Sequence, residues 1–203
     1  MAQGVSVSAL SPAPAAARLL LVPPDDARRV EVEAFIRAVY AERFGAQLKQ
    51  FAPTLVALED EQGLCAAAGW RNASDAPLFL EHYLDAPVEQ LLRLPSRDGI
   101  AEVGHLAARR AGEGRRLILQ LGPLLAQHGV RWVVSTLTEE LRHLFVRLGV
   151  VPLALGRADP QRLGASAGDW GDYYAHQPVV LAGSLETALQ ALARRRIVSA
   201  VPA

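Results

Sequence analysis

Hydrophobic and polar positions follow two different periods along the first part of the chain. Residues 17–23 form a short apolar run, which is typical of a buried strand. After it, apolar side chains recur every three or four positions, which predicts an amphipathic helix with one buried face: Val32, Phe35, Ile36, Val39, Tyr40 and Phe44. We expect this helix to begin after an N-cap at Asp25 or Asp26 and to end near Gly45.

The pattern then changes to that of paired strands. The strand-like runs 54–59 and 64–71 flank turn-forming residues, so this segment predicts a hairpin with Gly63 in its turn. Residues 77–94 mix apolar and polar positions without a long period, and they predict one or two short helices interrupted at Pro87.

The remaining chain alternates strand-like and helix-like segments. Strands are predicted at 100–108, 131–137, 150–155 and 177–183, and helices at 114–128, 139–149 and 184–196, with a kink or an interruption at Gly122-Pro123 and an aromatic loop at 168–174. This order predicts an α/β fold, a single domain over residues 17–203 whose mixed central sheet is flanked by helices. Residues 1–16 are rich in Ala, Ser and Pro, so we expect them to be disordered.

Composition and charge narrow the classes of function. Lys+Arg and Asp+Glu both number 21, so no global field attracts nucleic acid or an anionic membrane. Cys65 is the only cysteine and the five histidines lack ligand spacing, so we expect no disulfide, no metal and no permanently bound cofactor. No apolar run reaches the roughly 18 residues of a membrane span, and the N-terminus lacks a signal-peptide pattern, so we expect a cytoplasmic protein without a transmembrane segment.

One stretch carries an unusual combination of glycine and arginine. Residues 109–114 read R-R-A-G-E-G and lie between a predicted strand and the start of a predicted helix. Helix starts already carry partial positive charge, so the arginines nearby, Arg109, Arg110, Arg115 and Arg116, are unfavourable there unless an anion binds. Glycine allows close backbone approach to a ligand, and consecutive N–H groups at the helix start converge on it. The stretch predicts a pyrophosphate site, although a genome-wide bias toward arginine would also enrich the chain in this residue.

The R-x-x-G-x-G pattern, followed by a strand and by "LFVRLGV", resembles the Gcn5-related N-acetyltransferase (GNAT) superfamily. Phe145 stands where those enzymes often carry a tyrosine acid. A wider likeness extends over roughly residues 30–183, where the chain resembles the thermostable hemolysin family, whose fold is thought to be related to acyltransferases, including acyl-homoserine lactone synthases. The matching stretches are 35–58, 66–85, 102–108, 132–150 and 169–183. The family phrase "EVGNLA" has asparagine where this chain has His105.

The resemblance implies a GNAT-like acyltransferase fold with an acyl-CoA or an acyl carrier protein as donor and partner. The donor would lie along the strand end and the glycine turn, at Leu106, Ala107, Arg109, Arg110, Ala111, Gly112, Glu113, Gly114 and Arg115. Coenzyme A or another phosphopantetheine thioester then serves as a substrate.

Three residues are candidates for the chemistry. Glu102 lies in an apolar strand, where a carboxylate either works as a base or forms a buried pair with an arginine such as Arg71. His105 has a pKa suited to a base, but strand alternation places it opposite Glu102 unless a β-bulge intervenes, as the resemblance allows. Glu81 is a second carboxylate for the site, or a polar residue of a surface helix.

Aromatic and cationic residues suggest a substrate wall. The candidates for contact with the substrates are Trp70, Arg71, Tyr83, Phe145, Trp170 and Tyr173. Packing in the core explains most of them equally well. The leading hypothesis is N-acyl transfer to an amine of a small metabolite such as an amino acid. The alternatives are a membrane-active toxin, which the family name suggests, and a noncatalytic acyl-CoA-binding domain.

Overall fold

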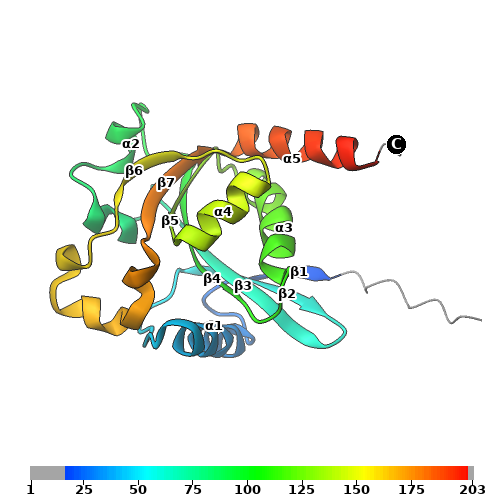
Figure 1. Cartoon of the computed structure of the whole chain (residues 1–203), viewed down its shortest axis with the longest axis horizontal. Helices are drawn as coiled ribbons and strands as arrows, with labels where there is room; N and C mark the ends of the chain where they lie inside the picture. The colour runs from blue at the N-terminus through cyan, green and yellow to red at the C-terminus, as the bar shows by residue number, and fades with distance from the viewer. Residues whose placement is uncertain (1–16, 201–203) are drawn as a thin grey trace, which may run out of the picture.

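The computed structural model describes residues 17–200, with side chains up to Arg194 (Figure 1). The predicted disorder of residues 1–16 lies outside the described residues. The strands are β1 (Arg18–Val22), β2 (Thr54–Asp60), β3 (Gly63–Asn72), β4 (Ile100–Ala108), β5 (Trp132–Leu137), β6 (Leu153–Arg157) and β7 (Val179–Ser184). The helices are α1 (Arg29–Phe44), η1 (Phe79–Tyr83), α2 (Val88–Leu91), α3 (Glu113–Gln127), α4 (Glu139–Arg147), η2 (Pro160–His176) and α5 (Leu185–Ala200).

The strands form one mixed sheet in the order β1-β2-β3-β4-β5-β7-β6. Neighbouring strands are antiparallel except for β4 and β5, which run parallel. A parallel pair needs a crossover connection, and α3 supplies it. The mixed central sheet flanked by helices is therefore confirmed.

Helices cover both faces of the sheet, with α1 on one side and α3 and α5 on the other (Figure 1). Strand β2 shows how the chain meets both layers. Leu55 and Ala57 pack in the cluster that contains α1, whereas Val56 and Leu58 pack in the cluster that contains α3. Because both faces are buried, the strand reads as a continuous apolar run rather than as an alternating one.

Several boundaries differ from the sequence prediction. Helix α1 begins at Arg29 rather than directly after the expected N-cap, because the Asp26 carboxylate instead accepts the Arg28 backbone N–H at 2.8 Å in a preceding turn. Strand β6 begins three residues later than expected. The predicted aromatic loop is part of the 3-10 turns of η2, and α3 continues through Pro123. Pro87 does separate η1 from α2, as predicted.

An irregularity in β4 positions the site described below. The pairing between β4 and β5 is limited to Ile100–Glu102 of β4 and Trp132–Val134 of β5, and the ladder ends after these residues. Against β3, Gly104 pairs with Gly69 but Ala107 pairs with Ala67, so β4 carries one extra residue, a β-bulge. Within the bulge, His105 has a φ of +54°, which is uncommon for a residue other than glycine. The bulge and the opening between β4 and β5 therefore occur at the same place.

Candidate active site

The glycine turn forms the start of α3. Gly112 is the N-cap residue with a φ of +88°, a conformation that favours glycine, and the helix begins at Glu113. The first backbone N–H groups of a helix have no partner within it, so this turn presents donors and partial positive charge to an anion. Arg109 and Arg115 are exposed beside the turn.

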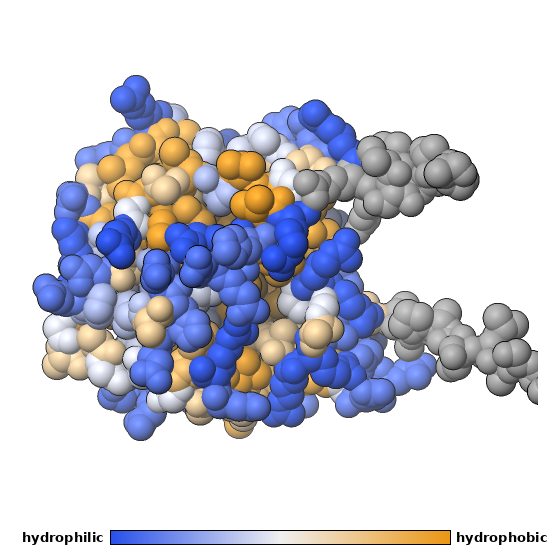
Figure 2. All heavy atoms as spheres, in the orientation of Figure 1, coloured by the Kyte–Doolittle hydropathy of each residue, from blue (hydrophilic) through white to orange (hydrophobic). Residues whose placement is uncertain are grey.

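A groove of about 570 Å³ extends from this turn along β4 to the end of α1 and the start of α4. We call it the donor groove. Hydrophilic side chains surround a hollow in this face of the molecule (Figure 2). The groove is lined by every predicted donor residue except Glu113: Leu106, Ala107, Arg109, Arg110, Ala111, Gly112, Gly114 and Arg115.

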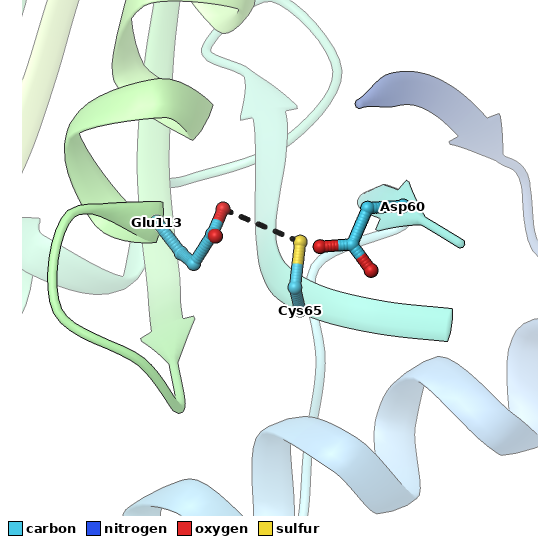
Figure 3. Close-up of side chains that lie close together, drawn as sticks. All are labelled: Asp60, Cys65 and Glu113. Atoms are coloured by element: carbon cyan, nitrogen blue, oxygen red, sulfur yellow. Dashed lines mark hydrogen bonds between the residues drawn. The ribbon is translucent and has the colours of Figure 1, made fainter. Parts of the chain in front are cut away.

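Glu113 instead turns its side chain away from the donor groove, toward Cys65 and Asp60 (Figure 3). Its carboxylate lies 3.5 Å from the Cys65 sulfur and pairs with Arg116 at 3.1 Å, while Asp60 pairs with Arg110. Burial, with Glu113 adding to it, raises the pKa of the Cys65 thiol, so the thiol stays protonated. A cation would have to displace arginines from both carboxylates. The cluster of Asp60, Cys65 and Glu113 therefore supports the glycine turn on the side that faces away from the donor groove.

A second cavity, of about 330 Å³, lies on the other side of the bulge. We call it the acceptor cavity. Strand β4 contributes one wall, and the remaining walls come from β3, η1, η2, the segment between α1 and β2, and single residues of α1 and β5. The structure brings these predicted residues together in it: Arg71, Tyr83, Glu102, His105, Trp170 and Tyr173.

Glu102 is held firmly at the edge of this cavity. Its carboxylate accepts the backbone N–H groups of Phe79 at 2.8 Å and Leu80 at 3.0 Å, and it lies 3.7 Å from the Arg71 guanidinium. Burial raises the pKa of Glu102, although the two N–H donors and Arg71 oppose the shift. Both interpretations of Glu102 from the sequence, a base and a buried partner of an arginine, are therefore compatible with the structure. Glu102 pairs with Arg71, and it also borders the acceptor cavity.

His105 reaches the same cavity as Glu102 because the bulge shifts its position along β4. Its Nε2 lies 3.2 Å from the Gln50 carbonyl oxygen, which can only accept, so the hydrogen-bond network assigns the proton to Nε2. Nδ1 is then an acceptor, and it has no partner among the described residues. Burial, with Arg71 and Arg29 nearby, lowers the pKa of His105 to about 4, so the ring is neutral at pH 7.

The sequence model of thermostable hemolysins matches residues 22–189. The chain belongs to the thermostable hemolysin family. No curated protein matches it. Within the described residues of this family member, no helix combines the length and the apolar character that crossing a bilayer requires.

Solved structures similar to this member of the thermostable hemolysin family include enzymes of acyl transfer. FeeM, an N-acyl amino acid synthase from uncultured soil microbes, matches with 15% identity and a TM-score of 0.63, covering 90% of this chain and 97% of that chain. BjaI, a CoA-dependent acyl-homoserine lactone synthase with SAM and isopentyl-CoA, matches with 12% identity and a TM-score of 0.61, covering 89% of each. The acyl-homoserine lactone synthase LasI has 14% identity and a TM-score of 0.58, with 86% and 95% covered. The likeness shows that the family member has a GNAT-like fold.

Besides Glu113, three more predicted residues lie outside both cavities of the hemolysin-family protein. Glu81 pairs with Arg97 at 2.8 Å and accepts the Leu78 backbone N–H at 2.8 Å, because its position in η1 turns it back toward the helix start. Trp70 is buried in the core on the α3 side of the sheet. Phe145 borders a third, apolar cavity rather than the donor groove.

That third cavity lies between α3, α5 and the sheet, and we call it the apolar cavity. It encloses about 100 Å³, and most of its walls are aliphatic. Leu106 and Ile118 line both the apolar cavity and the donor groove, so the two spaces are adjacent.

Two residues that the sequence did not single out also belong to the site. Tyr40 and Thr136 border both the donor groove and the acceptor cavity. The sequence pattern places Tyr40 on the apolar face of α1, so nothing in that pattern indicated that Tyr40 borders a cavity. Thr136 is a polar residue within the predicted strand 131–137, which was a signal that could have been noticed.

Proposed function

We propose that this protein is an N-acyltransferase that moves an acyl group from a phosphopantetheine thioester to the amine of a small metabolite such as an amino acid. The observation that carries the proposal is the meeting of two cavities at the bulge in β4. The residues that line both are Tyr40, Gly104, His105, Thr136 and Tyr173. A donor bound on one side and an amine bound on the other are brought into contact there.

The donor groove suits a phosphopantetheine thioester. The N–H groups at Gly112 to Gly114 bind the pyrophosphate of coenzyme A or the phosphate of a carrier protein, and Arg109 and Arg115 add charge-assisted contacts. The pantetheine arm follows β4 beyond Glu102, where the ladder to β5 has ended and backbone groups at the edge are available to its amides.

The apolar cavity suits the acyl chain. Leu106 and Ile118 form part of the wall of both the apolar cavity and the donor groove, close to the bulge where, in our proposal, the thioester carbon lies. Burial of each methylene group of a chain there is favourable by about 0.8 kcal/mol. Phe145 forms part of this wall, so in our proposal it contacts the acyl chain and takes no part in proton transfer.

The acceptor cavity suits an amine that carries a carboxylate. Within the described chain, Arg71 has one ion-pair contact, to Glu102 at 3.7 Å, so its guanidinium can also bind an acceptor carboxylate. His105 Nδ1 accepts the proton that the amine loses, and Glu102 holds the amine and Arg71 in position. Tyr173, like Tyr40, borders both cavities. Burial raises the pKa of Tyr173, so it keeps its proton; its hydroxyl donates to the Thr136 carbonyl oxygen at 3.1 Å and turns from there to the leaving sulfur.

Calorimetry tests the donor half of the proposal. Coenzyme A, a short and a long acyl-CoA, and a pantetheine-loaded acyl carrier protein are each titrated into the purified protein. We expect saturable binding that falls at least about 100-fold in the Gly112→Asp, Gly114→Asp variant, because carboxylates there repel the phosphate. Gln127→Asp is the matched control, since Gln127 is exposed at the far end of the same helix.

Product analysis tests the chemistry. The donor that binds is incubated with a mixture of amino acids, and mass spectrometry detects any N-acyl product. If the folded protein binds none of the four donors, the proposal is wrong, and leakage of dye from liposomes becomes the next assay for a membrane-active protein. Donor binding without any product would instead indicate the noncatalytic binding domain.

A further inference from the structure

Two buried side-chain atoms stand out by their missing hydrogen bonds. Over the described part of the chain, His105 Nδ1 and Thr136 Oγ1 are the buried side-chain nitrogen and oxygen atoms without a partner. Leaving a buried polar group unpaired is costly, so native proteins rarely do so unless a ligand satisfies the group. The two atoms therefore need a common explanation.

Both residues lie where β4 and β5 separate. His105 is in the bulge of β4, and Thr136 is two positions beyond Val134, the last β5 residue paired with β4. Each residue borders both the donor groove and the acceptor cavity. The backbone of Thr136 is well anchored, since it pairs with Val180 of β7 and its carbonyl oxygen accepts the Tyr173 hydroxyl at 3.1 Å. Only its side-chain hydroxyl is left unused.

The two unpaired groups have complementary chemistry. His105 donates through Nε2 to Gln50, so Nδ1 can only accept a hydrogen bond. The Thr136 hydroxyl can donate one, and a single torsion angle, χ1, directs it. Attack of an amine on a thioester needs one group of each kind, because an N–H proton must be accepted and a carbonyl oxygen gains negative charge.

We propose that the Thr136 hydroxyl donates a hydrogen bond to the thioester carbonyl oxygen and stabilises its negative charge during attack. The amine nitrogen forms a bond to the carbonyl carbon, and the π electrons move to the oxygen that Thr136 contacts. The carbonyl then re-forms, the carbon–sulfur bond breaks, and sulfur leaves as thiolate. The amine proton goes to His105 Nδ1, and Thr136 keeps its own proton throughout.

This role rests on the proposed acyl transfer, and it differs from a structural role in its effect on stability. A threonine that stabilised the fold would weaken it when replaced. Thr136→Val keeps the shape and the β-branch but removes an unpaired hydroxyl, so we expect a melting temperature equal to or above that of the wild type. Thr136→Ser keeps the hydroxyl and loses a methyl group, so it is the matched control.

Steady-state kinetics give the first test, with octanoyl-CoA, or octanoyl acyl carrier protein if only the carrier binds. We expect kcat of Thr136→Val to fall about 100-fold while KM for donor and acceptor changes less than about threefold, because the contact, already present in the bound thioester, strengthens mainly as negative charge develops on the oxygen. Thr136→Ser should retain most of the wild-type kcat. Unchanged kcat in Thr136→Val overturns the inference and leaves the acyltransferase proposal intact.

Infrared spectroscopy gives a second test that needs no turnover. The carbonyl stretch of octanoyl-CoA labelled with ¹³C at the thioester carbon is recorded on the protein without acceptor. We expect a shift to lower frequency in wild type and Thr136→Ser that is absent in Thr136→Val. Equal shifts in all three proteins overturn the inference. If the wild type neither binds nor transfers any donor, the proposed function is wrong, and this role is wrong with it.

Discussion

The donor groove and the acceptor cavity border the same strand, β4, yet they are assembled in different ways. The turn and strand end that form the phosphate side of the donor groove are one continuous stretch, residues 104–115. The acceptor cavity takes its walls from α1, β3, β4, β5, η1, η2 and the segment between α1 and β2. In the donor groove, backbone groups supply the contacts that we expect with the substrate. In the acceptor cavity, side chains supply them.

This difference predicts how each region responds to substitution. Backbone donors at a helix start survive most side-chain changes and are sensitive to the glycines that shape the turn. The acceptor cavity should depend on single side chains, each held by partners from a distant segment. Variants of Arg71 and Ala188 can therefore separate the two halves, because each should change the binding of one substrate and leave that of the other unaffected. A variant of His105, which borders both cavities, should instead lower turnover.

The largest effect on turnover is expected at His105. If Nδ1 accepts the amine proton, His105→Asn should lower kcat by about 100-fold or more, while calorimetric affinity for the donor stays the same. Asparagine tolerates the left-handed conformation at φ +54°, so the variant should fold. Glu102→Gln is the comparison, and a greater loss of kcat there at equal stability would identify Glu102 as the base instead.

His105 should also give the folded protein a specific pH dependence. Its pKa is about 4 in the folded state and about 6.5 in an unfolded chain, so the unfolded chain binds the proton first as the pH falls. The free energy of unfolding should therefore drop by about 3 kcal/mol between pH 6.5 and pH 4 because of this group. Denaturant titrations across that range should show a smaller drop in His105→Asn. An identical pH profile in both proteins would contradict the buried neutral imidazole.

Replacement of Arg71 should weaken the binding of the acceptor alone. Arg71→Met removes the guanidinium but keeps much of its apolar stem, so we expect KM for a carboxylate-bearing amine to rise about 10- to 100-fold. The affinity for coenzyme A should stay unchanged. Arg71→Lys should recover part of the loss. An equal effect on an amine without a carboxylate would show that Arg71 acts through Glu102 and does not bind the acceptor.

A smaller effect is expected in the apolar cavity. Ala188 of α5 lies in its wall, and Ala188→Phe should fill space that a longer acyl chain would occupy. Each buried methylene contributes about 0.8 kcal/mol, so the wild type should gain about fourfold in donor affinity per carbon until the cavity is full, and the variant should stop gaining at a shorter chain. Chain-length series of acyl-CoA in calorimetry measure this. Identical series would place the acyl chain elsewhere.

The sequence predicted the donor groove better than the acceptor cavity for a physical reason. Contiguous residues at a strand–helix junction have a geometry that the local backbone determines, and Gly112 follows that rule. The acceptor cavity depends on where distant segments meet. Glu81 was expected there, but its place in η1 directs it to Arg97, and the sequence indicated Thr136 only as part of a strand. From the sequence, a β-bulge at His105 was only a condition under which His105 and Glu102 could face the same cavity.

The cluster behind the glycine turn should show the smallest effect on activity. Cys65 donates to the Leu58 carbonyl at 3.1 Å and packs against Glu113, away from the donor groove. Cys65→Ala should therefore lower stability by about 1 kcal/mol, through lost packing, and leave kcat within about twofold of the wild type. Cys65→Ser, which retains a donor for Leu58, is the control in the same melting and kinetic assays. A loss of kcat beyond tenfold at unchanged stability would mean that the thiol takes part in acyl transfer, and the separation between a supporting cluster and the reacting site would then fail.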